Sequence, residues 1–274
     1  MAKTTHKILP PVHPNVGLEM EYARKLEALV DAMHKSIKYW VLMNYKNNLP
    51  GTVTIMAEDD STSITLDKIM RRLSRYWQKK FIEAAQQLGI YFAQKSTQRA
   101  DTTLKQILKE SGFAIEFKLT AAARDVLQST VKENVALITN LSQQHLKQIE
   151  ILVHHSVQSG RDLGGLAKEL EQRYDMTKKR ARLIAKDQNN KATASIVRVR
   201  QNEIGIKQAK WLHSHAGKTP RPTHVAMNSK LYDVVEGMWD KDADGKGKGR
   251  YVYPGELINC RCVSRSIIPA LGVR

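Results

Sequence analysis

Both cysteines of the chain lie near its C-terminal end, as Cys260 and Cys262, with one arginine between them. Three of the nine histidines lie upstream of them, at His213, His215 and His224. Thiolate sulfur and imidazole nitrogen are preferred ligands of zinc, and four of them around one ion form a tetrahedral site. The sequence therefore predicts a candidate zinc site of Cys260, Cys262, His224 and one of the other two histidines.

A second interpretation of these residues needs no metal. Two cysteines separated by one residue are poorly placed for an intramolecular disulfide, so they can also be small buried thiols beside a locally hydrogen-bonded histidine. Arg221 and Asn259 would then hold the loop through hydrogen bonds to the backbone. Both interpretations bring one structural cluster together in space: Arg221, His224, Asn259, Cys260 and Cys262.

An enzymatic interpretation is also open at this point. Arg221 and His224, with Lys218 nearby, permit general acid–base chemistry on a phosphodiester. The spacing fixes no second acid–base group, and the sequence has no paired carboxylates and no nucleophile motif. It therefore favours a structural or assembly protein over an enzyme, and we name no catalytic residue.

A short acidic segment resembles the opening of a calcium-binding loop. Asp240, Asp242 and Asp244 alternate with other residues, and Gly245 follows at the turn position. The twelfth position, where such a loop has a bidentate glutamate, is Tyr251, and Lys246 and Lys248 add positive charge inside the loop. We therefore expect a surface loop here rather than a calcium site.

A larger pattern surrounds these residues. A tryptophan-led strand at Trp211 is followed by Arg-Pro-Thr-His at 221–224, a variable loop, Pro-Gly at 254–255 and Asn-Cys-Arg-Cys at 259–262. An upstream helix, residues 179–188, reads KRARLIAKDQ. Over roughly residues 125–268, this pattern resembles the Mu F-like family, the minor head or head morphogenesis proteins of tailed bacteriophages.

The resemblance implies a minor capsid protein that docks at the portal vertex inside the head and assists procapsid assembly and DNA packaging or ejection. The implied partners are the portal protein, the major capsid or scaffolding protein and non-specifically bound packaged DNA. The protein would occupy the host cytoplasm during assembly and then the virion. Two alternatives stay open: a nucleic-acid-processing enzyme or toxin carried by the C-terminal domain, and a free DNA-binding protein.

Positive charge is concentrated in the C-terminal third. The whole chain has a net charge of +17, of which residues 176–274 contribute +12, from 20 Lys and Arg against 8 Asp and Glu. Such a surplus attracts polyanions in a salt-sensitive way. The basic residues expected to face DNA are Lys178, Lys179, Arg180, Arg182, Lys186, Arg198 and Arg200.

The elements that must position these residues follow from hydrophobic periodicity and from helix-ending residues. Helices are expected over residues 18–44, 63–95, 102–111, 120–159, 163–173 and 177–202, and strands over 206–212, 251–253 and 262–268. The expected fold is mainly α, with long N-terminal helices in a bundle or hairpin followed by a small α+β C-terminal domain.

The expected elements divide the chain into three regions. These are an extended N-terminal arm (1–17), a helical portal- or capsid-docking region (18–175) and a basic Mu F-like α+β domain (176–274). The long apolar stripes of the helices exceed what one chain need bury, which predicts docking on a partner. No apolar run approaches the length of a membrane span, so we expect no membrane association.

Overall fold

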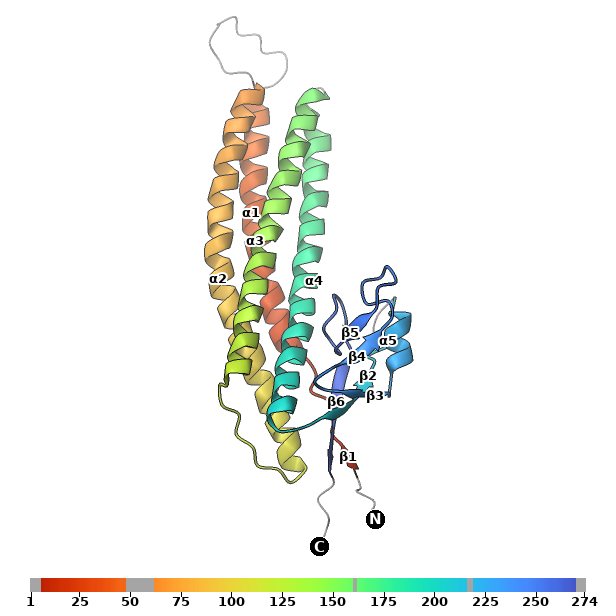
Figure 1. The fold of residues 1–274 in the computed structure, drawn as a ribbon. Coiled ribbons are helices and arrows are strands. Elements are labelled where there is room, and N and C mark those ends of the chain that lie inside the picture. The colour runs from red at the N-terminus through yellow and green to blue at the C-terminus, as the bar shows by residue number, and fades with distance from the viewer. Residues whose placement is uncertain (1–5, 48–61, 160–161, 216–218, 270–274) are drawn as a thin grey trace, which may run out of the picture. The chain divides into compact units, whose positions relative to one another are not determined.

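A computed structural model of the chain describes residues 6–47, 62–159, 162–215 and 219–269. Four long helices are followed by a small C-terminal region with antiparallel strands, so the expected mainly-α fold class is confirmed (Figure 1). The helices are α1 (Val16–Asn47), α2 (Thr62–Glu110), α3 (Ala121–Gln158) and α4 (Leu163–Glu203). Among the described residues, no helix has an apolar stretch long enough to cross a membrane.

Helices α2 and α4 are longer than the sequence predicted, because two expected breaks do not occur. Residues 96–101 continue α2, and the hydroxyls of Thr102 and Thr103 donate to carbonyls one turn earlier. Thr177, expected to cap a separate helix, lies inside α4. Its hydroxyl donates to the carbonyl of Arg173 at 2.8 Å, so the helix uses this polar side chain internally.

The described chain forms two compact units, and each long helix contributes residues to both. The first, here called the mixed unit, comprises residues up to 20, 90–132 and 186 onward. The second, here called the helical unit, comprises residues 21–89 and 133–185. The limits of these units differ from the domain boundaries expected from the sequence after residues 17 and 175. Hydrophobic periodicity indicates where a helix lies, but it does not indicate where along the helix the packing partners change.

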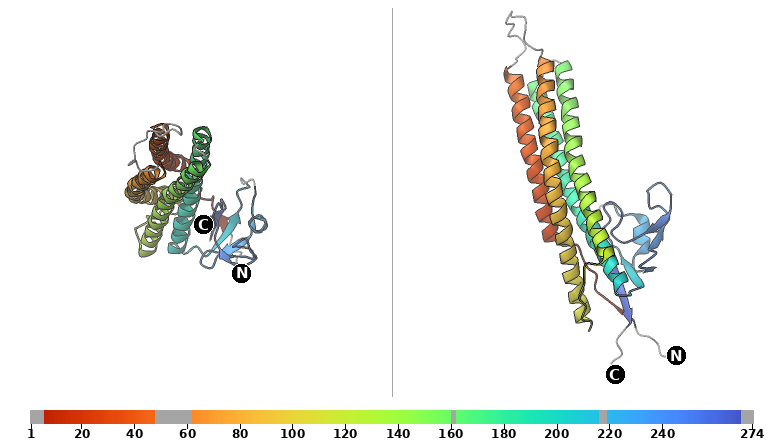
Figure 2. Two further views of the ribbon diagram at one scale, coloured as in Figure 1. Left: turned by 90° about the horizontal axis from the view of Figure 1, so that it is seen from above. Right: turned by 60° about the vertical axis from the view of Figure 1, so that its left-hand side comes forward.

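The helical unit consists of four helical segments that run alongside one another (Figure 2). Tyr22 donates a hydrogen bond of 2.7 Å to the side-chain oxygen of Asn134 in its interior. His145 also lies there, and its Nδ1 is 2.8 Å from the hydroxyl of Thr177. Burial lowers the pKa of His145 to about 4, so this histidine packs as a neutral ring. Fully buried apolar residues of this unit include Leu26, Phe81, Ile138, Ile149 and Leu170.

The mixed unit contains all the strands found in the described residues. They are β1 (His6–Ile8), β2 (Gln208–Leu212), β3 (Leu231–Asp233), β4 (Met238–Asp240), β5 (Arg250–Val252) and β6 (Val263–Pro269), and a short helix α5 (Pro222–Met227) follows β2. One antiparallel sheet has the order β1-β6-β2-β3, and β4 pairs with β5. Its core includes Leu9, Ile196, Trp211, Met227 and Val252.

The N-terminal arm is held by the C-terminal strand. In β1, Lys7 pairs with Ile268, and the N–H of Leu9 donates to the carbonyl of Ser266 at 2.9 Å. The Leu9 side chain is fully buried. Part of the expected extended arm is therefore an edge strand of the sheet.

The C-terminal half of α4 supplies an inner wall of the mixed unit. Gln201 is fully buried, and its side-chain N–H groups donate to the hydroxyls of Ser264 and Ser266 in β6. Gly255, in the loop before β6, has a positive φ of 83°, and an added Cβ would lie 2.7 Å from the Cβ of Ala194. A side chain at residue 255 would therefore push the loop away from α4.

Arg200 is another buried residue of α4, which corrects its assignment to a DNA-facing surface. Its guanidinium is only 2% exposed and makes two hydrogen bonds of 2.8 Å to Asp101 of α2 and one to Glu203. These bonds raise its pKa, led by those to Asp101. The sequence groups Arg200 with the other basic residues of this helix. It does not reveal that the carboxylate partner of Arg200 is Asp101, which lies in a distant part of the chain.

The Arg200–Asp101 pair gives a first prediction. Asp101→Asn should lower the free energy of unfolding by about 3 kcal/mol, because it leaves a buried guanidinium without its bidentate partner. The matched control is Asp125→Asn on α3, an exposed position, which should change stability by less than about 0.5 kcal/mol. Chemical denaturation measures both, and equal stability of the two variants would contradict the prediction.

The close packing of Gly255 against α4 gives a second prediction. Gly255→Ala should destabilise the protein by about 3 kcal/mol, from the left-handed backbone and the clash with Ala194 together. Gly205 also has a positive φ, of 75°, but no atom lies within 4 Å of an added Cβ. Gly205→Ala should therefore cost only the backbone strain, about 1 kcal/mol. Equal losses in thermal or chemical unfolding would show that the contact with α4 is unimportant.

Candidate metal centre

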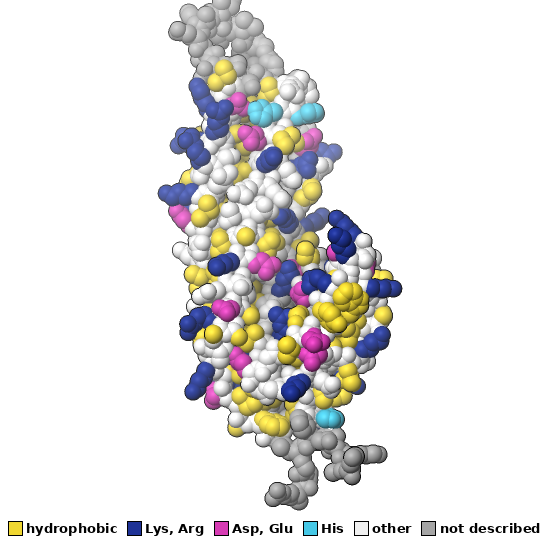
Figure 3. All heavy atoms as spheres, in the orientation of Figure 1, with side chains coloured by type: hydrophobic (Ala, Val, Ile, Leu, Met, Phe, Trp, Pro, Cys, Tyr) yellow, Lys and Arg dark blue, Asp and Glu magenta, His cyan; other side chains and the backbone are white. Residues whose placement is uncertain are grey.

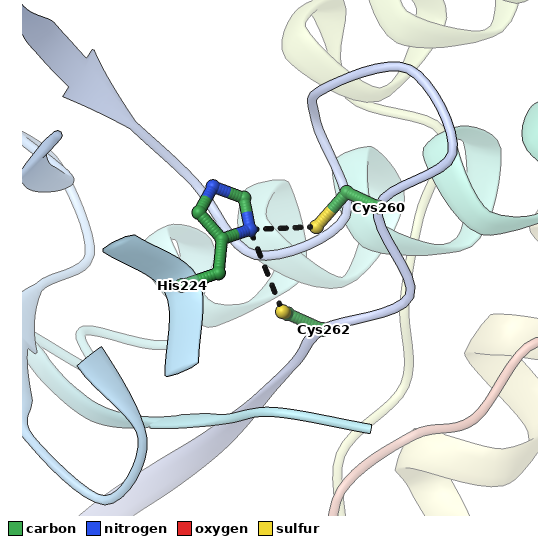
Figure 4. A group of neighbouring side chains, drawn as sticks. All are labelled: His224, Cys260 and Cys262. Atoms are coloured by element: carbon green, nitrogen blue, oxygen red, sulfur yellow. Dashed lines mark hydrogen bonds between the residues drawn. The ribbon is translucent and has the colours of Figure 1, made fainter. Parts of the chain in front are cut away.

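Three of the predicted ligands meet in the mixed unit. The Nδ1 atom of His224 lies 3.4 Å from the Cys260 sulfur and 3.7 Å from the Cys262 sulfur (Figure 4). The three donor atoms all lie within 4.8 Å of one another, and the residues are between 2% and 4% exposed. The segments that carry His224 and the two cysteines, far apart in sequence, therefore converge on one buried point.

Helix α5 positions His224. Pro222 stands in its first turn, where the missing N–H costs nothing, and its fixed φ starts the helix. The imidazole packs edge-on against the buried Trp211 ring, with 5.0 Å between ring centroids. Arg221, just before the helix, donates to the carbonyl of Ile258 at 3.1 Å. Arg221 thus links the start of α5 to the loop that carries the cysteines.

The cysteine loop is held by α4. Asn259 adopts a left-handed conformation, with φ of 59°, which asparagine tolerates better than most residues. Its backbone N–H donates to the Asp187 carboxylate at 2.5 Å, and Asp187 is also paired with Lys191 at 3.1 Å. This contact gives a structural role to the KRARLIAKDQ helix segment, because its aspartate anchors the residue that precedes Cys260.

Asp240 completes the surroundings of His224 from the opposite side. Its Oδ2 atom lies 3.2 Å from His224 Nε2, and the Asp240 side chain is fully buried. Its other oxygen accepts the backbone N–H of Asp242 at 3.0 Å. The sequence pattern indicates Asp240 only as the start of a calcium-like loop. The pairing of β4 with β5 turns it inward instead, and nothing in the spacing to residue 224 signals this contact.

The two thiols are electrostatically inequivalent. A hydrogen bond with Cys262, followed by the contact with His224, lowers the pKa of Cys260. The same hydrogen bond with Cys260, reinforced by burial, raises the pKa of Cys262. In this arrangement the thiolate form is therefore favoured at Cys260 and the protonated form at Cys262.

His213 and His215 are placed differently from the other candidates. His213 is 7% exposed and accepts the backbone N–H of His215 on its Nδ1 at 3.2 Å. Burial is the main reason that the pKa of His213 is lowered. His213 lines a pocket of about 310 Å³ together with His224 and Cys260, whereas the exposed His215 is not among its lining residues.

The arrangement suits holding a cation more directly than transforming a substrate. Lys218, considered above for acid–base chemistry, lies outside the described residues, and Arg221 is engaged by a backbone carbonyl. Two sulfurs and one ring nitrogen face a common point, and the Asp240 carboxylate lies behind the ring. This donor set is typical of borderline-soft divalent metals.

Comparison with known proteins agrees with the motifs that these contacts explain. The model of the family described as "Phage Mu protein F like protein" matches residues 147–265. A curated protein of Haemophilus influenzae, described as uncharacterized, is 24% identical over 264 residues. That alignment covers 95% of this chain but 55% of the relative, so the chain spans about half of its length. No solved structure matches. The matched region 147–265 holds α4, α5 and the cysteine loop, and its similarity to the phage Mu protein F-like family supports the resemblance that the sequence motifs indicated.

Proposed function

We propose that the protein is a minor head protein of a tailed bacteriophage, which docks at the portal vertex inside the head and assists procapsid assembly and DNA packaging or ejection. Similarity to the phage Mu protein F-like family supports its assignment to head morphogenesis. The finer assignment, to the portal, is supported by an apolar groove on the helical unit. The protein then acts as a structural component of the virion and not as an enzyme.

The groove lies between α1 and α2. It has a volume of about 460 Å³ and is lined by Ser36, Trp40, Ile69, Arg72, Leu73, Tyr76 and Trp77. Trp40 is 48% exposed and Tyr76 is 52% exposed, although both are large aromatic residues. Aromatic side chains that stay exposed around a groove are typical of protein interaction sites.

Basic side chains flank the groove. Arg72 lines it, and Arg71 and Arg75 are exposed on the same helix. A partner segment that fills this groove would therefore combine an apolar anchor with acidic neighbours. We assign that segment to the portal protein, because the family match places the chain among head proteins and the groove is on the part of the chain without the cysteine cluster.

Docking can be tested by co-purification with portal rings. Trp40→Ala together with Tyr76→Ala should reduce retention by about tenfold or more, because central aromatic residues dominate interface energies. Ile151→Ala is the control, since Ile151 is 60% exposed on α3 and does not line the groove. Point variants are preferable to truncation at residue 176, which would cut α4. Unchanged retention of the double variant would refute this assignment.

Contact with packaged DNA is the second part of the proposal, and the intramolecular contacts of several basic residues expected to face DNA narrow the surface available for it. Arg182 pairs with Glu27, Lys178 lies 3.2 Å from Asp31, and Arg198 lies over the Tyr253 ring. Exposed charges include Lys179 on α4 and three lysines in the loop between β4 and β5: Lys241, Lys246 and Lys248. Figure 3 shows Lys and Arg spread along the visible face rather than in one dense patch. This distribution favours weak binding without sequence preference.

Measured DNA affinity should therefore fall steeply as salt concentration rises and should not depend on sequence. Replacing Lys241, Lys246 and Lys248 together by Gln should flatten the plot of log affinity against log salt by about 3, or about one per lost phosphate contact. The same three positions changed to Arg should retain the wild-type slope. A strong preference for one sequence, or cleavage of the labelled DNA, would favour one of the alternative functions instead.

A further inference from the structure

We infer that His224, Cys260 and Cys262 bind one zinc ion, which clamps α5 to the loop before β6. The inference rests on the geometry of the mixed unit and does not depend on the proposed role at the portal. It assigns a structural metal site to the point where α5 meets the loop before β6. These two segments are far apart in the sequence.

The distances agree with those around a tetrahedral zinc ion. Zinc lies about 2.0 Å from an imidazole nitrogen and about 2.3 Å from a thiolate sulfur, so nitrogen and sulfur ligands of one ion are about 3.6 Å apart. The observed separations from His224 Nδ1 are 3.4 Å to Cys260 and 3.7 Å to Cys262. A simple hydrogen bond would draw the nitrogen toward one sulfur, whereas here both sulfurs are at nearly the same distance.

The orientation of the imidazole ring supports a metal ligand. His224 Nε2 faces Asp240 Oδ2 at 3.2 Å, and neither atom has another partner among the described residues. A proton on Nε2 directed at this carboxylate leaves the lone pair of Nδ1 directed at the two sulfurs (Figure 4). Metal-bound histidines usually donate their other ring N–H to a carboxylate or carbonyl, which fixes the tautomer. Asp240 is thus a positioning residue for the site.

The fourth coordination position faces the pocket of about 310 Å³ beside the cluster. His213 lines that pocket, and it follows Leu212, which pairs with Val263, although its ring nitrogens lie outside the 4.8 Å group formed by the other three donors. Its Nδ1 already accepts the N–H of His215, so Nε2 is the ring nitrogen that would turn to the ion. We therefore assign the fourth ligand to His213.

Zinc content of the native protein is the direct test. The full chain, purified without a His tag, should contain one zinc per chain by elemental analysis. Its two thiols should be protected from a thiol reagent and should become reactive when a chelator is added. Because this comparison uses the wild-type protein, it does not depend on whether cysteine variants fold.

Variants then resolve the individual roles. Cys260→Ser and Cys262→Ser should abolish zinc retention, while Asp240→Asn should weaken zinc affinity by about 10–100-fold in chelator competition. His213→Ala should weaken it as well. His155→Asn is the control, since His155 is an exposed histidine on α3 in the helical unit and does not line the pocket. Unaltered affinity in His213→Ala would overturn the assignment of the fourth ligand.

One result would overturn the zinc site as a whole. The protein would stay free of metal when dialysed against zinc, and one thiol would react rapidly with iodoacetamide without a chelator. That behaviour identifies Cys260, His224 and Asp240 as a thiol activated by a histidine. Portal co-purification would be unaffected by this result, so failure of the zinc site is distinguishable from failure of the proposed function.

Discussion

The hydrogen bond from the Asn259 backbone to the Asp187 carboxylate joins the cysteine loop to α4, and the surroundings of the cluster depend on it. Because Cys260 follows directly, a shift of this anchor would move one sulfur away from His224. Gly255 reinforces the same attachment, since its missing side chain lets the loop lie against Ala194. Gln201 then binds β6 through two serine hydroxyls. The C-terminal half of α4 thus fixes both ends of the segment that carries the cysteines.

Buried polar groups shape the mixed unit as much as its apolar core does. Arg200 with Asp101, and His224 with Asp240, are pairs whose members come from distant parts of the chain. Removing one partner of such a pair leaves a desolvated charge, so these contacts specify the arrangement of the elements more sharply than apolar contacts do. The calcium-like segment is an example, because Asp240 turns inward to His224 while Asp242 and Asp244 accept N–H groups of their own loop.

The two compact units carry different parts of the proposed role. The helical unit presents the apolar groove around Trp40 and Tyr76, with arginines beside it. The mixed unit holds the histidine–cysteine cluster and exposes the lysine-rich loop between β4 and β5. The proposed zinc clamp would add a link between α5 and the loop before β6 to the apolar core of the mixed unit, which includes Trp211 and Met227. Docking and stabilisation can therefore be changed independently by substitution.

The sequence alone determined the mainly-α class and the long helices. It also indicated that His224, Cys260 and Cys262 lie close together. Helical periodicity and the family-like motifs are local signals, and they carried these inferences without tertiary contacts. The helix limits at Thr102 and Thr177 were wrong because polar side chains can be satisfied within a helix as well as at its cap. Tertiary structure alone decided that Asp240 faces His224, that Arg200 is buried against Asp101 and that the helices divide between two units. These features depend on pairs of residues far apart in the chain, and neither spacing nor composition specifies which distant partner a side chain will meet.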